Sequence, residues 1–156
     1  MYQIRHFSLS LKPRLAHLEL SQERCIPQYK KTVQIVHSYN KPFLLRSYGC
    51  IFDVMDDIIN IAKIDAKHSN EYQIAKFPVW VEKYGDKIGN FGGIDTDAVC
   101  RLNKLEMKEY ILDVVNKCVG HGGVAFGSEN SIPDYVPVEG YLNMVETIRE
   151  YRGDNK

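Results

Sequence analysis

The sequence predicts an α/β fold of four parallel strands, each followed by a helix. Short runs rich in strand-forming residues recur at intervals of about 20 to 35 residues. The longer segments between them carry apolar residues at helical spacing. No Gly/Ser-rich linker or low-complexity tract divides the chain. We therefore expect residues 1–156 to form a single domain.

The four predicted strands are runs that are too short to form helices. The first follows a turn at Asn40-Lys41, after a loose opening to about Leu20 and a helix. The runs are PFLLRS (42–47), IDAKH (64–68), IGNF (88–91) and VAFG (124–127).

Two prolines indicate where helices begin. Pro27 precedes Tyr29, Val33 and Val36, whose spacing predicts a helix before the first strand. Proline is tolerated in a helix only in its first turn, so Pro78 predicts a helix that begins near residue 77.

A capping motif bounds another helix. Asn103 and Glu106 have the spacing of a capping box, so a helix should begin near Lys104 and end at about Val119, before Gly120. Apolar spacing predicts further helices over 51–58 and over 141–148, the last ending near residue 152.

Composition narrows the classes of function. The chain has 156 residues, 44% of them hydrophobic, and 20 basic residues balance 20 acidic ones. This balance argues against nucleic acid and membrane surfaces as partners. No apolar run is long enough to span a membrane, and the N-terminus lacks the pattern of a signal peptide, so we expect a cytoplasmic protein. The four cysteines form no C-x-x-C motif, so reduced thiols without a metal framework are expected.

Polar residues follow every predicted strand. In parallel α/β folds the carboxyl ends of the strands form the ligand-binding rim. The segments at this rim are RSYGC (46–50), HSNE (68–71), GGIDTD (92–97) and GSENS (127–131). The rim is therefore the predicted site.

Each candidate at the rim has a functional and a structural reading. Arg46 can clamp a carboxylate beside the Tyr48 hydroxyl, or it can pair with an acid on a neighbouring strand. His68 and Glu71 can act as a base and its orienting carboxylate. Alternatively, His68 bonds a backbone carbonyl while Glu71 supports the next helix.

The later rim segments offer backbone and small polar groups. Gly92 and Gly93 allow a ligand to approach the backbone closely. Asp95 can accept a hydrogen bond from that ligand or cap the next helix, a role that we expect more of Asp97. The segment GSENSIPDYVP (127–137) predicts a stiff loop, because it combines small polar residues with two prolines.

Four segments carry a family likeness. They are KPFLLRSYG (41–49), IDAKHSNE (64–71), YGDKIGNFGGIDTD (84–97) and GGVAFGSENSIPDYVPVEGYLNMVETIREYRG (122–153). Together they resemble the C-terminal half of the uroporphyrinogen decarboxylase superfamily, over residues 20–153. The resemblance implies the last four βα units of a (β/α)8 barrel of the TIM type, with the site at its carboxyl rim. The N-terminal half would come from elsewhere.

The resemblance implies a carboxy-lyase that acts on a tetrapyrrole or a related anionic substrate once a missing N-terminal half completes it. The alternatives are a methyltransferase component that works with a corrinoid protein and a truncated paralogue that binds without catalysis. The related methyltransferases carry a zinc-binding His-x-Cys pair where this chain has Arg46 and Tyr48, with Cys50 two residues late. We therefore expect no metal and no cofactor.

The sequence thus predicts a specific set of site residues. The expected catalytic residues are Arg46, His68, Glu71 and Asp95. The expected substrate-binding residues are Tyr48, Gly92, Gly93, Ser128, Glu129 and Asn130, with Glu129 standing where the family usually has a small residue. Because a half-barrel exposes two strand edges, we expect a homo-oligomer or an N-terminal half-barrel as partner.

Overall fold

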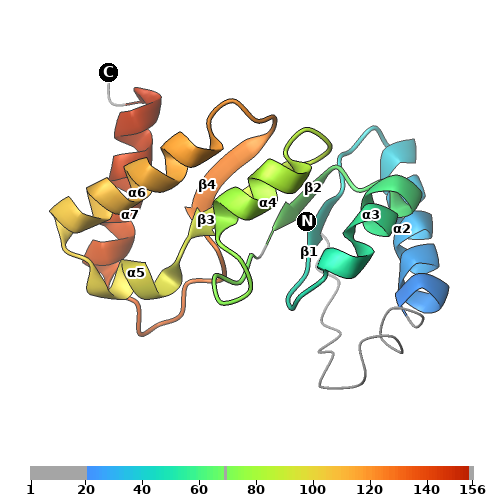
Figure 1. Ribbon diagram of the computed structural model, residues 1–156, viewed down its shortest axis with the longest axis horizontal. Helices are drawn as coiled ribbons and strands as arrows, with labels where there is room; N and C mark the ends of the chain where they lie inside the picture. Colours follow the sequence, from blue (N-terminus) through green and yellow to red (C-terminus); the bar gives the residue numbers. More distant parts are fainter. Residues whose placement is uncertain (1–20, 69, 155–156) are drawn as a thin grey trace.

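A computed structural model describes residues 21–68 and 70–154 of the chain. It contains one four-stranded sheet with helices packed along it (Figure 1). The strands are β1 (Leu44–Arg46), β2 (Ala66–His68), β3 (Gly89–Ile94) and β4 (Val124–Ser128). The helical segments are η1 (Ser21–Cys25), α2 (Ile26–Ser38), η2 (Phe52–Val54), α3 (Met55–Asp57), η3 (Ile58–Ala62), α4 (Phe77–Tyr84), α5 (Thr96–Arg101), α6 (Lys104–Cys118) and α7 (Val138–Arg152).

The sheet is parallel throughout, and its strands lie in chain order, β1-β2-β3-β4. The predicted α/β fold with four parallel strands is therefore confirmed. In the register, Arg46 lies opposite His68, and Ile94 lies opposite Ser128. The carboxyl ends of all four strands consequently meet at one rim.

Helices cover one face of this sheet. Parallel strands in sequential order are joined by right-handed crossovers, which place every connecting helix on the same side. On β3, Asn90 is fully buried, whereas the next residue, Phe91, is 37% exposed although strands flank it on both sides. In the part of the chain that the structure describes, the face carrying Phe91 is therefore open.

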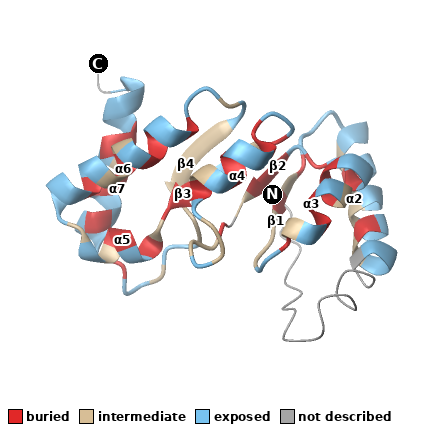
Figure 2. Cartoon of the chain, viewed as in Figure 1, coloured by how far each residue is buried: buried red, intermediate tan, exposed pale blue. Residues whose placement is uncertain are grey.

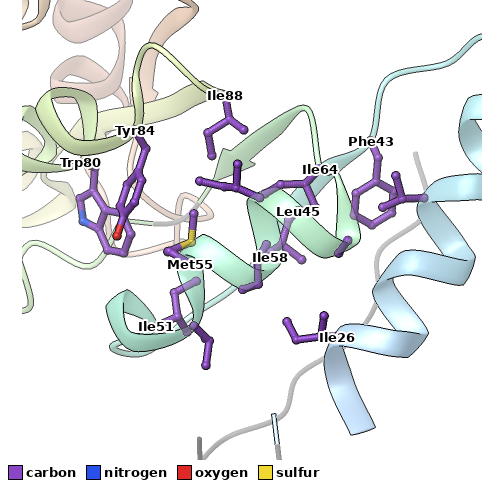
Figure 3. Close-up of a cluster of buried hydrophobic side chains, with 14 residues drawn as sticks. Ile26, Phe43, Leu45, Ile51, Met55, Ile58, Ile64, Trp80, Tyr84 and Ile88 are labelled. Atoms are coloured by element: carbon purple, nitrogen blue, oxygen red, sulfur yellow. The ribbon is translucent and has the colours of Figure 1, made fainter. Parts of the chain in front are cut away.

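The core lies between the sheet and the helices and has two parts. The first joins α2, the helical segment after β1, and the end of α4, with Leu45, Met55 and Trp80 among its side chains (Figure 3). The second joins α4, α6 and α7 around Phe77 and Ile111. Buried residues accordingly lie on the inward sides of the helices, whereas every residue of β4 is only half-buried (Figure 2).

Most helix boundaries follow the sequence signals. Pro27 and Pro78 lie in the first turns of α2 and α4. The Asn103 side chain accepts from the N–H of Glu106, and the Glu106 side chain accepts from the N–H of Asn103, which completes the capping box of α6. The helix predicted to end near Arg152 is α7, which ends there.

The helical segment after β1 is less regular than the apolar spacing suggested. Instead of one helix over 51–58, the chain forms η2, α3 and η3 in succession and continues to Ala62. Lys63 then adopts a left-handed conformation with φ 62°. The helical winding is tighter in η2, a 3-10 helix, and wider in η3, a π-helix, while the apolar side chains of the segment lie in the core. Apolar spacing alone does not predict such changes of winding.

The third strand is longer than predicted. We expected it to end at Phe91, with Gly92 and Gly93 in the following turn, but β3 continues to Ile94. Gly92 and Gly93 have φ values of 117° and 99° and pair with Phe126 and Gly127 of β4. The glycines resembled a turn locally, whereas pairing with β4 keeps them in the sheet.

Gly93 allows α4 to pack closely on β3. A Cβ atom at Gly93 would overlap the Phe77 ring, and the positive φ disfavours any other residue. We expect Gly93→Ala to lower the free energy of unfolding by about 2 to 4 kcal/mol, the sum of strain and overpacking. Urea unfolding measures this value.

Gly127 is the matched control, because it pairs with Gly93 across the β3–β4 ladder and a Cβ atom there would meet nothing within 4 Å. Gly127→Ala should change the free energy of unfolding by less than about 1 kcal/mol. Equal losses in the two variants would contradict the close packing of Phe77 on Gly93.

Candidate functional site

The end of β4 and the residues directly after it contact the ends of β1 and β2 and the loop after β2. The Ser128 carbonyl oxygen lies 3.3 Å from Nε2 of His68, at the end of β2. The Glu129 carboxylate accepts from the Tyr72 N–H at 2.9 Å. The Asn130 side-chain oxygen accepts from Arg46, at the end of β1, at 3.0 Å. Residues 128–131 therefore assemble the rim, and we call them the rim segment.

Arg46 is the cation of this rim. Its Nη2 lies 3.0 Å from Asn130 Oδ1 and 2.8 Å from Ser131 Oγ, and it also donates to the Tyr48 hydroxyl. The Tyr48 hydroxyl in turn donates to Asn130 Oδ1 at 2.6 Å. These four residues form what we call the arginine group.

The partners that the described residues give Arg46 are uncharged. None of the ion pairs among the described residues includes Arg46, so pairing with an acid on a neighbouring strand is not found. Its Nε is buried and has no hydrogen-bond acceptor among the described residues. A guanidinium with an uncompensated charge and a spare N–H is suited to bind an anion.

His68 lies beside the arginine group and bonds a backbone carbonyl, which was the structural alternative for this residue. Burial lowers the pKa of His68, the nearby Arg46 and Lys67 charges lower it further, and the bond to Ser128 partly opposes them. The imidazole is therefore neutral at pH 7. With the Nε2 proton donated to the carbonyl, Nδ1 is left as an acceptor.

Glu71 lies near the same rim but bonds a different strand end. Its Oε1 accepts from the Gly49 N–H at 2.9 Å, which links the loop after β2 to the loop after β1. No hydrogen bond between Glu71 and His68 is found among the described residues, so Glu71 does not orient the imidazole here. Its backbone carbonyl accepts from Ile74, before α4 begins at Phe77.

Asp95, at the end of β3, caps α5. Its Oδ1 accepts from the Asp97 N–H at 3.0 Å. The expectation that Asp97 would be the cap is wrong, because α5 begins at Thr96 and Asp97 lies inside its first turn. There Asp97 pairs with Arg101, four residues on.

A second polar group surrounds Asp95 and Glu129. The Asp95 N–H donates to the Tyr110 hydroxyl at 3.1 Å, and the Tyr110 hydroxyl interacts with that of Tyr72. Burial raises the pKa of Glu129, and the Asp95 carboxylate raises it further. We call these four residues the acid–tyrosine group; two of its members, Tyr72 and Tyr110, were not predicted.

Gly92 lets the two acidic strand ends approach each other. A Cβ atom at Gly92 would lie 3.3 Å from the Glu129 Cα and 3.4 Å from the Ser128 carbonyl oxygen. Together with Gly93 against Phe77, this shows that both glycines admit other parts of the protein closely. The sequence suggests that a ligand approaches these two glycines, whereas in the structure Glu129, Ser128 and Phe77 occupy the space beside them.

Lys67 lies behind the rim, on the helix-covered face. The side chain is 1% exposed, its Nζ donates to Asn70 Oδ1 at 2.9 Å, and it lies 4.1 Å above the Trp80 ring. Burial lowers the pKa of Lys67 to about 7, with Glu71 opposing the shift. Because strand residues alternate between faces, Lys67 points away from the face that carries His68.

Metal-ligating residues do not gather in the described part of the chain. Over residues 21–68 and 70–154, no three His, Cys, Asp or Glu side chains are placed to hold a metal ion. Cys25, Cys50, Cys100 and Cys118 are free thiols. Within the same ranges, no helix has the length and apolar character needed to cross a membrane.

Comparison with known proteins does not assign the chain to a family. No family model matches the chain, and no curated protein matches it either.

The pKa of Lys67 makes stability depend on pH. The unfolded chain binds a proton at Lys67 up to about pH 10.5, whereas the folded chain releases it near pH 7, so stability rises with pH between these values. From pH 7 to 8.5 we expect the free energy of unfolding to rise by about 1.5 kcal/mol in wild type but not in Lys67→Met.

The pH range ends at 8.5 because Cys118, whose pKa burial raises to about 11, contributes the opposite slope at higher pH. Lys83→Met, at an exposed lysine of α4, is the control and should keep the wild-type slope. Urea unfolding at each pH measures all three proteins. A wild-type slope in Lys67→Met would show that the buried amine keeps its proton.

Proposed function

We propose that the chain is the C-terminal half of a (β/α)8 barrel of the uroporphyrinogen decarboxylase superfamily and that its rim binds a carboxylated, anionic substrate. The reaction class we assign is that of a carboxy-lyase acting on a tetrapyrrole or a related compound. The resemblance over residues 20–153 supports the family. Four parallel strands in chain order, with helices along one face, are what half of such a barrel requires.

The observation that carries the proposal is the arginine group. Arg46 is the last residue of one edge strand, Asn130 and Ser131 follow the other, and the Arg46 guanidinium joins them at the rim. Its partners there are uncharged, so an anionic ligand would supply the missing opposite charge. A carboxylate matches the planar guanidinium in shape and can accept two hydrogen bonds from it.

Neighbouring residues supply the other interactions that such a substrate needs. The hydroxyl groups of Tyr48 and Ser131 lie within hydrogen-bond distance of Arg46. The neutral His68 lies next to this group, opposite Arg46 in the strand register. Because the two residues are close, the Arg46 charge contributes to the lowered pKa of His68. A neutral imidazole offers a hydrogen-bond acceptor without repelling the arginine.

A second polypeptide would complete the barrel. Parallel sheets are normally covered on both faces, whereas the face of this sheet that carries Phe91 is open in the described structure. Among the described strands, β1 and β4 each have one edge without a partner strand. We propose a second copy of the chain, or an N-terminal half-barrel, as the partner that pairs with these edges.

Binding of uroporphyrin, followed by fluorescence, tests the role of Arg46. We expect Arg46→Ala to weaken binding about 10- to 100-fold, because a hydrogen-bonded charge pair is lost. Arg46→Lys should restore only part of the affinity, since lysine lacks the planar fork. Arg149→Ala, at an exposed position on α7, is the matched control and should bind as wild type does.

Unchanged binding by Arg46→Ala would contradict the proposed rim. Binding of a cobalamin in preference to uroporphyrin would instead favour the methyltransferase alternative with a corrinoid protein. Binding without any turnover of uroporphyrinogen, in the chain or its assembly, would favour a non-catalytic paralogue.

Light scattering on the purified chain tests the partner. We expect a mass of about twice 18.0 kDa, because a second copy covers the open face and both edges. Phe91→Lys places a charge on that face and should shift the chain towards monomer. Lys83→Met is a suitable control, since Lys83 lies on α4, away from the open face. A monomeric wild-type chain that binds no tetrapyrrole would contradict the assignment for this polypeptide alone.

A further inference from the structure

We propose that Glu129, paired with Asp95 at the ends of β4 and β3, supplies the proton that replaces the carboxyl group of the substrate, and that Tyr72 and Tyr110 position it. This inference rests on the proposed function. It assigns a proton donor to the rim at which the arginine group binds the substrate.

Glu129 is held from several sides. Its backbone N–H donates to the Ile94 carbonyl at 2.9 Å, so β3 fixes the main chain. Its carboxylate accepts from the Tyr72 N–H at 2.9 Å and interacts with the Thr96 N–H. A proton donor fixed in this way needs little reorganisation when the substrate binds.

Thr96 provides a second, independent observation at the same place. It is 9% exposed, and its buried Oγ1 has no hydrogen-bond partner among the described residues. Because the Thr96 N–H interacts with the Glu129 carboxylate, this hydroxyl belongs to a residue in direct contact with the proposed donor. Buried hydroxyls normally have a partner, so the residue beside Glu129 carries an unused hydrogen-bonding group.

The surroundings keep a proton on Glu129 at a higher pH than usual. Burial raises the pKa of Glu129, and the Asp95 carboxylate raises it further, while the N–H groups of Tyr72 and Thr96 oppose the shift. From α6, Tyr110 and Asp113 face Tyr72, and Asp95 and Glu129 raise the pKa of Tyr72 as well.

The two tyrosines remain protonated and act as positioning residues. Tyr110 accepts from the Asp95 N–H and interacts with the Tyr72 hydroxyl, so α6 links both acidic strand ends. The rings of Tyr72 and Tyr110 lie 6.4 Å apart, centroid to centroid. This contact holds the loop after β2, and with it the Tyr72 N–H, against Glu129.

The proposed step needs no reactant besides water, which returns the proton to Glu129. The bond between the substrate carbon and its carboxylate breaks, the electron pair stays on that carbon, and carbon dioxide leaves. The Glu129 carboxyl then gives its proton to the carbon and becomes a carboxylate, which water reprotonates. The neighbouring Asp95 charge favours this reprotonation, because two adjacent carboxylates repel each other.

The test compares turnover of uroporphyrinogen at several pH values in wild type, Glu129→Gln and Asp95→Asn. Glutamine keeps an acceptor for the Tyr72 N–H but cannot give up a proton. We expect Glu129→Gln to lower kcat by about 100-fold or more with little change in KM, as for loss of a general acid. Asp95→Asn should shift the fall of kcat at high pH to lower pH, because it removes the charge that favours protonated Glu129.

The control is Glu109→Gln, at an exposed position on α6, which should keep the wild-type kcat and pH profile. If wild type turns over and Glu129→Gln keeps its kcat within about threefold, far from the loss expected of a general acid, the inference is overturned while the proposed function stands. If wild type, in every assembly state, turns nothing over, the proposed function fails and the inference fails with it.

A titration of the side-chain carboxyl groups by 13C NMR tests the inference separately from the proposed function, because it does not require turnover. Glu129 should release its proton at higher pH than a glutamate carboxyl in a short unstructured peptide, and Asp95→Asn should lower the Glu129 midpoint. A Glu129 carboxyl that titrates together with that of the peptide would overturn the inference, whatever the turnover.

Discussion

The rim depends on residues 128–131, which lie at the end of the last strand and directly after it. Through Ser128, Glu129 and Asn130, the rim segment bonds in turn to His68, Tyr72 and Arg46. Three consecutive residues thus join the ends of strands that lie far apart in the sequence. The close approach of β3 and β4 makes this possible, and it needs a residue without a Cβ atom at Gly92. Both the arginine group and the acid–tyrosine group depend on it.

The sheet order separates a helix-covered face from an open one. Crossovers of one hand place the helices together, so apolar burial is concentrated on one side of the strands. Lys67 points into that side and keeps its amine against Trp80 and Asn70. Arg46 and His68 reach the rim, where their side chains are only half-buried. The polar groups that can meet a substrate are therefore those that the helices do not cover.

The sequence predicted the features that depend on local signals. The strand runs, the capping box at Asn103 and the prolines of α2 and α4 are each specified within a few residues. The acid–tyrosine group is not, because it requires the register that places Ile94 opposite Ser128 and so brings Asp95 near Glu129. Tyr110 lies in an apolar stripe of α6, where the sequence suggests only a core residue. Its hydroxyl becomes relevant only when β3 ends beside it.

The two rim groups have complementary electrostatic properties. Arg46 attracts an anion, whereas Asp95 and Glu129, if both were ionised, would repel it from the neighbouring ends of β3 and β4. Burial and mutual repulsion raise the pKa of Glu129, which lowers the negative charge at the rim at a given pH. The same shift that would make Glu129 a proton donor therefore also helps Arg46 to hold a carboxylate. An anionic substrate would in turn stabilise the proton on Glu129, so substrate binding and protonation of this carboxyl should be coupled.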